Sequence, residues 1–171
     1  IVIVIVSMSS QHDPIKQNIM DWCQQDGIRC VEAPANPQMV WGLIIHSQVT
    51  IYKITQHPDR IYFQSSINLA QVHRTLVNQT WDNNQRNMMM FNMKKLVGQL
   101  NVLLNFIHNN EELVTFHTYK IHCHETISKA DFLEKYLRIQ AVHEIMLNQL
   151  NIELGIALAS SQNTGNVDTG R

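Results

Sequence analysis

The 171-residue sequence carries little charge and shows no excess of either sign. Charged residues make up 16% of the chain, and the formal net charge is -1. Proteins that bind nucleic acid neutralise phosphates with lysine and arginine, and this chain has no surplus of either. No apolar run approaches the ~20 residues of a membrane-spanning helix. We therefore expect a soluble, cytoplasmic protein whose partners include neither nucleic acid nor a membrane.

Glycine is also scarce, and the motifs of common catalytic sites are absent from the sequence. None of the six glycines belongs to a phosphate-binding loop or to a Gly-x-Ser-x-Gly elbow. His143 and Glu144 begin like the zinc-protease motif, but Leu147 stands where that motif requires its second histidine. We therefore expect no cofactor, and the sequence favours a protein that is not an enzyme.

Cysteine is sparse as well: the chain has three, Cys23, Cys30 and Cys123, with no Cys-x-x-Cys spacing. An odd number at scattered positions suits reduced thiols in a cytosolic protein better than a disulfide framework. We interpret all three as small buried side chains. Cys30 would act as a nucleophile only if a histidine lay beside it.

The two ends of the chain differ in composition from its middle. Residues 1–6, IVIVIV, are apolar and β-branched, and they lack the basic flank and the cleavage site of a signal peptide. The last residues are rich in Ser, Asn, Gly and Thr, which is typical of a flexible tail. We predict an N-terminal extension over 1–10, one domain over 11–155 and a flexible tail over 156–171.

The first half of the chain predicts a helix followed by a strand meander. Asp13 and Pro14 are a helix cap and a first-turn proline, an apolar stripe follows, and Gly27 ends a helix over 13–26. Four short segments rich in Val, Ile, Tyr and Phe come next, separated by turn residues: IRCVEA, MVWGLIIH, VTIYKIT and RIYFQSSI. We predict that they pair as antiparallel strands.

The second half predicts two helices, a strand and a last helix. Helices are expected from Asn68 and over 86–107, a strand over 111–125, and a final helix from Ser128 to about 154. The predicted fold class is therefore α+β, an antiparallel sheet meander with helices packed on one face. Which face they cover is left open, because MVWGLIIH is apolar at nearly every position.

The stretch TYKIHCHET gathers potential metal ligands in consecutive positions. In a strand, His122 and His124 lie on the same face, and two imidazoles at this spacing can reach one ion such as zinc. A third ligand would have to come from a histidine elsewhere in the chain. The candidates are His46, His57, His73 and His143.

The alternative for the same stretch is an ordinary half-buried strand. The face of His122 and His124 also carries Thr118 and Lys120, which is typical of a polar, solvated face. The opposite face would then lie in the core. It carries Tyr119, Ile121 and Cys123.

The segment Met88, Met89, Met90 and Phe91 is unusually rich in methionine. Flexible methionine side chains suit surfaces that bind other proteins, so these four residues are the candidate protein-binding site. The other interpretation is that they fill the core at the start of a buried helix.

Three stretches carry a resemblance to a known family: IMDWCQQDGIRCVEA, VTIYKITQHPDRIYFQSSINLA and SKADFLEKYLRIQAVHEI. Over residues 12–152 the chain resembles an uncharacterised family of small archaeal proteins, whose members look like type III secretion chaperones. The resemblance implies helices on one side of a curved antiparallel sheet. It also implies a homodimer that binds extended segments of other proteins, and it brings no catalytic residues.

Two functions follow as hypotheses. The first is a non-enzymatic, chaperone-like module that acts as a homodimer and binds another protein or a peptide segment. The second is a metal-binding protein or a metal-dependent enzyme that uses His122 and His124.

Overall fold

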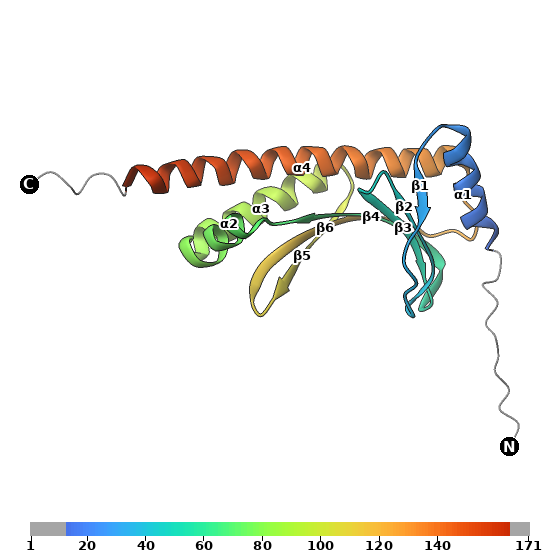
Figure 1. Cartoon of the computed structure of the whole chain (residues 1–171), viewed down its shortest axis with the longest axis horizontal. Coiled ribbons are helices and arrows are strands. Elements are labelled where there is room, and N and C mark those ends of the chain that lie inside the picture. Colours follow the sequence, from blue (N-terminus) through green and yellow to red (C-terminus); the bar gives the residue numbers. More distant parts are fainter. Residues whose placement is uncertain (1–12, 165–171) are drawn as a thin grey trace, which may run out of the picture.

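The computed structural model describes the backbone of residues 13–164 and the side chains of residues 13–155. Figure 1 shows the order and arrangement of the elements. They are α1 (Pro14–Gln25), β1 (Cys30–Glu32), β2 (Met39–Ile45), β3 (Val49–Ile54), β4 (His57–Asn68), α2 (Gln71–Thr75), the π-helical turn η1 (Leu76–Thr80), α3 (Asn83–Gln99), β5 (Leu103–Asn109), β6 (Glu112–His122) and α4 (Lys129–Thr164).

The strands form one antiparallel sheet in the order β1-β2-β3-β4-β6-β5. Two of its hairpins turn through consecutive residues with positive φ, His46 with Ser47 and Asn110 with Glu111. Such turns match the right-handed twist of the flanking strands. The predicted α+β class and the predicted meander of the first four strands are confirmed.

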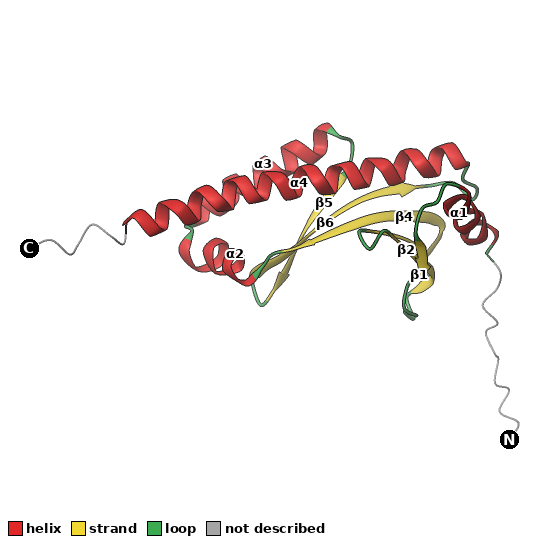
Figure 2. Cartoon of the chain, turned by 45° about the horizontal axis from the view of Figure 1, so that its top comes forward, coloured by secondary structure: helices red, strands yellow, loops and turns green. Residues whose placement is uncertain are grey.

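The helices lie on one face of this sheet, which we call the covered face. Helix α4 runs along the sheet, α1 packs near its N-terminal end, and α3 lies beside it over the other half of the sheet (Figures 1 and 2). Alternate residues of each strand point into this layer, including Leu43, Ile51, Phe63 and Phe116, all fully buried. The opposite face, which we call the open face, has no described helix over it.

Helix α1 begins and ends where the sequence predicts. The carboxylate of Asp13 accepts a hydrogen bond from the Ile15 N–H at 2.9 Å, and Gly27 has a φ of +66°, which ends the helix without side-chain strain. The apolar stripe of α1 faces the core. Asp13 also accepts from Lys53 Nζ at 3.1 Å, so the helix cap is tied to strand β3.

The predicted helix over 86–107 is wrong at its C-terminal end. Helix α3 stops at Gln99, Asn101 adopts a φ of +54°, and residues 103–109 form the edge strand β5. The error arises because Leu103, Leu104 and Ile107 fit helical spacing as well as a strand with apolar side chains on both faces. These residues form a strand because they pair with β6, and this tertiary contact cannot be predicted from the local spacing of apolar residues.

The last helix is longer than the sequence predicts. Helix α4 continues to Thr164, through a segment predicted to be tail, where residues 156–159 are Ile, Ala, Leu and Ala, most of them good helix formers. Residues 165–171 and the predicted N-terminal extension lie outside the described residues. No helix in the described part of the chain is both long and apolar enough to cross a membrane.

An aromatic cluster joins α1 and α4 to the sheet. The ring of Phe132 is fully buried, with its centroid 5.8 Å from Trp22, 6.4 Å from Phe63 and 6.1 Å from Tyr136. Phe132 thus contacts a ring from α1, from β4 and from the next turn of α4. Such contacts add to the free energy gained from burying each ring.

Replacing Phe132 should therefore destabilise the fold strongly. We expect Phe132→Ala to lower the free energy of unfolding by about 3–5 kcal/mol, because it leaves a cavity among three rings. Leu137→Ala is the control, since Leu137 is 55% exposed on the same helix and should change stability by less than about 0.5 kcal/mol. Urea unfolding followed by circular dichroism measures both, and equal losses would contradict this description of the core.

Candidate functional site

Strand β6 turns its polar side toward the helices. Thr118 is 2% exposed, His122 is 6% exposed, and Lys120 lies opposite Phe63 on the covered face. The interpretation of this side as the solvated one is therefore wrong. The alternation of the strand is as predicted, but Lys120 has a partner on α4 and His122 has one on the loop before α4. The buried Thr118 hydroxyl has no hydrogen-bond partner among the described residues. Tyr119 and Ile121 lie on the open face instead.

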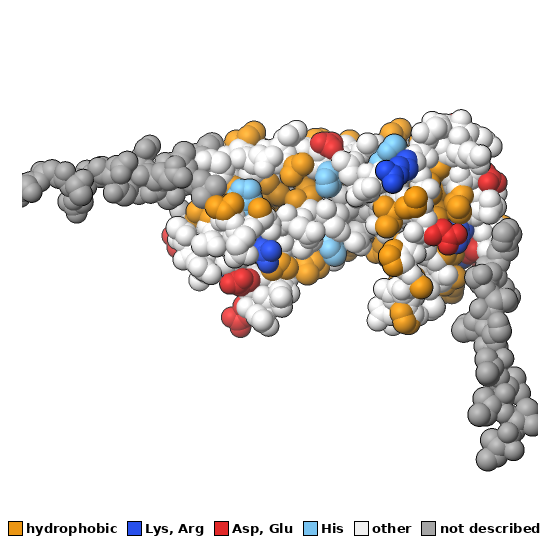
Figure 3. All heavy atoms as spheres, in the orientation of Figure 1, with side chains coloured by type: hydrophobic (Ala, Val, Ile, Leu, Met, Phe, Trp, Pro, Cys, Tyr) orange, Lys and Arg blue, Asp and Glu red, His pale blue; other side chains and the backbone are white. Residues whose placement is uncertain are grey.

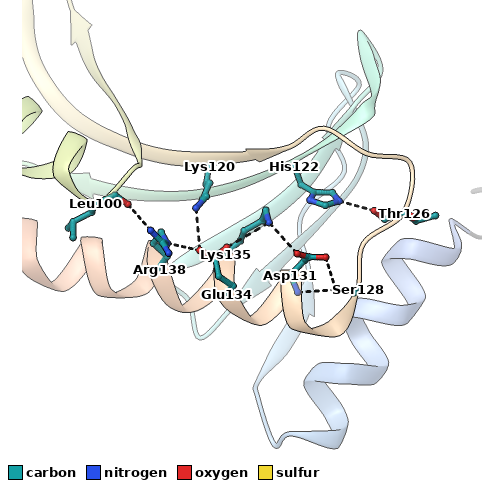
Figure 4. A network of polar contacts seen from close by, with 9 residues as sticks. All are labelled: Leu100, Lys120, His122, Thr126, Ser128, Asp131, Glu134, Lys135 and Arg138. Carbon is teal, nitrogen blue, oxygen red and sulfur yellow. Dashed lines mark hydrogen bonds and ion pairs between the residues drawn. The ribbon is translucent and has the colours of Figure 1, made fainter.

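The partners of Lys120 form a chain of ion pairs along α4, drawn in Figure 4. Lys120 Nζ lies 3.3 Å from Glu134 Oε1, which Arg138 Nε also contacts at 2.6 Å. Arg138 in turn donates to the Leu100 carbonyl at 3.2 Å. Partial burial raises the pKa of Glu134, but the hydrogen bond and charge of Lys120, with Arg138 and Lys135, hold the net pKa below its ordinary value. These contacts join α4, β6 and the end of α3, so the role of the ion pairs is structural.

His122 also connects strand β6 to the loop that leads into α4. Its Nε2 lies 2.8 Å from the Thr126 carbonyl, which can only accept, so Nε2 carries the proton and Nδ1 is left as a potential ligand atom. The exposed His124 follows the end of the strand, with its ring centroid 5.3 Å from that of His122. Among the described residues, no group of three His, Cys, Asp or Glu side chains could hold a metal ion.

The structural and metal-binding interpretations of His122 predict different stability changes. We expect His122→Ala to cost about 1–3 kcal/mol of unfolding free energy, because it removes a buried ring and leaves the Thr126 carbonyl without its donor. His124→Ala should be nearly neutral. If a metal ion held both rings, the two variants would lose stability alike and EDTA would destabilise the unmodified protein, so unfolding with and without EDTA decides between them.

A serine and a histidine also meet between sheet and helix. Ser65 Oγ on β4 lies 2.5 Å from His143 Nδ1 on α4. Ser65 is 2% exposed, and no described carboxylate hydrogen-bonds to His143. A hydrolytic triad needs both an accessible hydroxyl and an orienting acid. The pair therefore fixes α4 to β4 rather than forming a nucleophile.

The four residues proposed to bind protein divide between two environments. Met89 is 1% exposed and faces the core, and Met90 is half-buried. Met88 and Phe91 are 60% and 62% exposed. Met88 and Met89 line a shallow hollow of about 410 Å³, together with Trp81 and neighbouring polar side chains. The site as predicted is thus reduced to two exposed apolar side chains on α3.

The open face of the sheet is the surface that the sequence did not reveal as a site. Its cross-strand rows, given by the strand register, contain no Lys, Arg, Asp or Glu side chain among the described residues. The rows are Val31, Ile44, Thr50, Gln64, Tyr119, Leu103; Gly42, Tyr52, Tyr62, Ile121; Ser66, His117, Asn105; and Asn68, Thr115, Ile107. The outermost apolar side chains are well exposed, 46% for Val31 and 51% for Leu103. Figure 3 shows that apolar side chains reach the surface of the molecule in several groups, with charged side chains beside some of them.

A small hollow of about 240 Å³ lies in the middle of the open face, and we call it the tyrosine hollow. It is lined by Tyr52, Tyr62, Gln64, Asn105, His117 and Tyr119. The rings of Tyr52 and Tyr62 stack at 5.2 Å with an interplanar angle of 8°, and the Tyr52 hydroxyl donates to Gln64 Oε1 at 2.7 Å. Burial, followed by the nearby Tyr62 and Tyr119, raises the pKa of Tyr52. The hollow is aromatic and uncharged at neutral pH.

Burial lowers the pKa of His117, the histidine of the tyrosine hollow. No group facing it from β3, β4 or β5 in this hollow carries a negative charge that would favour the protonated ring. A lowered pKa means that the folded state binds fewer protons than the unfolded state below the ordinary value of 6.5. The fold therefore favours the neutral form of His117 over the protonated form.

The stability contributed by neutral His117 is present above pH 6.5 and is lost as the pH falls through that value toward the lowered pKa. We expect the protein to lose more unfolding free energy between pH 7.5 and pH 5.5 than its His117→Gln variant, which cannot be protonated there. Urea unfolding at fixed protein concentration measures both losses. Equal losses would show that His117 titrates alike in the folded and unfolded states.

Comparison with known proteins places the chain among uncharacterised ones. A family model described as "Uncharacterized conserved protein (DUF2299)" matches residues 15–150. The crystal structure of an uncharacterized protein from Methanothermobacter thermautotrophicus is similar with a TM-score of 0.68 and 11% identity, over 81% of this chain and 98% of that one. YbjN, described as a putative transcription regulator from E. coli, matches with a TM-score of 0.43 and 11% identity, over 74% and 86% of the two chains. No curated protein matches. The likeness to the archaeal protein concerns the fold.

Proposed function

We propose that this chain, which belongs to the DUF2299 family of uncharacterised conserved proteins, is a non-enzymatic protein-binding module that forms a homodimer through its open face. One observation carries the proposal. The sheet buries one face under its helices and leaves on the other an uncharged surface rich in tyrosine and aliphatic side chains.

The composition of the open face is that of a protein interface. Interface cores are depleted in charged residues and enriched in aromatic ones such as tyrosine. Tyr52, Tyr62 and Tyr119 lie at the centre of this face, and each is half-buried. An uncharged face with tyrosine at its centre and exposed aliphatic side chains at its edges is thus suited to being covered by a partner.

A second copy of the chain fits this face better than a charged partner does. In a two-fold symmetric contact the same patch meets itself, so any charge near the axis would meet a like charge. The described rows of the open face contain no side chain that is charged at neutral pH. The size also suits a dimer. Six strands at ~4.8 Å spacing, of which β4 and β6 have 12 and 11 residues and the others three to seven, give an area on the order of ~700 Å², close to the ~800 Å² per partner found in stable interfaces.

The chaperone-like part of the proposal concerns a different surface, the outer edge of β5. This seven-residue strand lies at the end of the sheet, and β6 pairs with only one of its sides. An extended segment of another protein can add to such an edge through main-chain hydrogen bonds. The exposed Met88 and Phe91 on α3, the element that packs on β5, provide apolar side chains near the same half of the molecule.

The alternative function is a metal-binding protein or metal-dependent enzyme that uses His122 and His124. It is supported by the proximity of the two rings. The donation from His122 Nε2 to Thr126 accounts for the buried ring without a metal. Comparing His122→Ala and His124→Ala, with and without EDTA, separates this alternative from the proposed one.

Charge introduced on the open face should separate the dimer without unfolding the chain. We expect the unmodified protein to have twice the 19.8 kDa mass of one chain in light scattering. Leu103→Asp and Val31→Asp should each shift the mass toward one chain, because the contact would bury a carboxylate that has no partner of opposite charge on this face. Both side chains are about half exposed in the single chain, so circular dichroism should be unchanged.

The matched control is Leu137→Asp, which places the same charge on a side chain of α4 that is 55% exposed. This variant should remain a dimer. The proposal would be overturned by an unmodified protein with the mass of one chain at 100 µM, or by a dimer that survives both open-face substitutions. Dissociation caused by Leu137→Asp alone would place the dimer contact on the helices.

A further inference from the structure

Two of the three cysteines meet between α1 and the sheet. Cys23 is in the last turn of α1 and fully buried, and Cys30 is the first residue of β1, opposite Ile45 on the covered face. The chain reverses between them, with Gly27 at positive φ and the Ile28 N–H donating to the Cys23 carbonyl at 2.8 Å. Both side chains therefore point into the layer where α1 packs on the sheet.

The two thiols differ in exposure and in acidity. The two sulfurs lie close enough to affect each other's acidity. The neighbouring Cys23 thiol lowers the pKa of Cys30 despite the opposing effect of burial. The neighbouring Cys30, together with burial, raises the pKa of Cys23. Cys30, the more exposed of the two, is therefore the more acidic thiol.

Cys30 is also the thiol that a small molecule can reach. It lines a surface hollow of about 390 Å³ together with Gln17, Met20, Asp21, Gln24, Ile28 and Arg29. Cys23 lies behind it, in the core. The predicted burial of all three cysteines holds for Cys23, whereas Cys30 is half-buried and Cys123 is exposed.

We propose that Cys23 and Cys30 form a thiol–disulfide exchange site that takes low-molecular-weight disulfides through the hollow beside Cys30. This inference goes beyond the proposed protein-binding function and does not depend on it. It rests on the shared placement of the two side chains between α1 and the sheet and on the accessibility of Cys30. Cys123 is separate from the pair, because it follows β6 at the surface.

The exchange takes two steps. The Cys30 thiolate attacks one sulfur of the small disulfide, a mixed disulfide forms on Cys30, and the other half leaves as a thiolate. Cys30 then no longer carries the negative charge that raised the pKa of Cys23. Cys23 loses its proton and attacks the Cys30 sulfur, which releases the second small thiolate. In sum, two protein thiols and one small disulfide give one protein disulfide and two small thiols.

The tryptic map of this chain gives a direct test, because Arg29 lies between the two cysteines. Cleavage after Lys16, Arg29 and Lys53 places Cys23 in peptide 17–29 and Cys30 in peptide 30–53. The reduced protein is treated with oxidised glutathione, quenched with acid, alkylated with N-ethylmaleimide and digested. We expect the intact mass to fall by ~2 Da, as two hydrogens are lost, and peptides 17–29 and 30–53 to appear covalently linked.

Variants assign the role of each thiol. Cys23→Ala should accumulate one glutathione on Cys30, Cys30→Ser should leave Cys23 unmodified, and Cys123→Ser should form the 17–29 to 30–53 link as the unmodified protein does. Because Cys23 is in the core, circular dichroism checks that the Cys23→Ala variant folds. The link between peptides 17–29 and 30–53 in the unmodified protein tests the proposal even if this variant does not fold. The proposal is overturned if the folded protein forms no such link, or if glutathione is found on Cys123 while Cys30 stays alkylated.

Discussion

The packing of helix α4 on one face of the sheet is the constraint on which the rest of the structure depends. Phe132 brings rings of α1, β4 and α4 together. Further along α4, the side chains of Ile139, Val142 and Met146 are buried as well. Helix α4 packs on the strands β3, β4 and β6, whereas α1 contacts β1 and α3 contacts β5, so the layer built around α4 covers both halves of the sheet. Without it the sheet would expose both faces to water, at a cost of roughly 25 cal/mol for each Å² of apolar surface.

The same packing explains why polar residues occur inside the molecule. Lys120, His122 and Ser65 lie on the covered face, and each has a partner on α4 or on the loop that precedes it: Glu134, Thr126 and His143. A buried polar group without such a partner costs ~1–3 kcal/mol. The residues that first suggest chemistry therefore serve to orient α4 on the sheet. The open face, which is free of this constraint, is where a function is proposed.

The two proposed functional features, the open face and the pair of thiols, lie on different parts of the molecule. One face is covered by helices and buries mainly apolar side chains with a few polar ones, whereas the other is uncharged and carries a hollow lined by tyrosine. Cys23 and Cys30 are brought together by a reversal of the chain at Gly27, a feature of local structure. Their different exposures, by contrast, result from the way α1 packs on the sheet.

Several features follow from the sequence by itself, because they depend on neighbours within a few residues. The Asp13 cap, the end of α1 at Gly27, the strand meander and the alternation of TYKIHCHET along β6 are all local patterns. Only the tertiary structure decided which side of that alternation is buried, because the alternation in the sequence is the same whichever face of the strand a distant helix covers. Pairing with β6 likewise turned Leu103 to Ile107 into a strand, although their spacing also fits a helix. The open face, the tyrosine hollow and the contact of two cysteines arise from segments that meet only in the folded chain, where packing and not local propensity sets the lowest free energy.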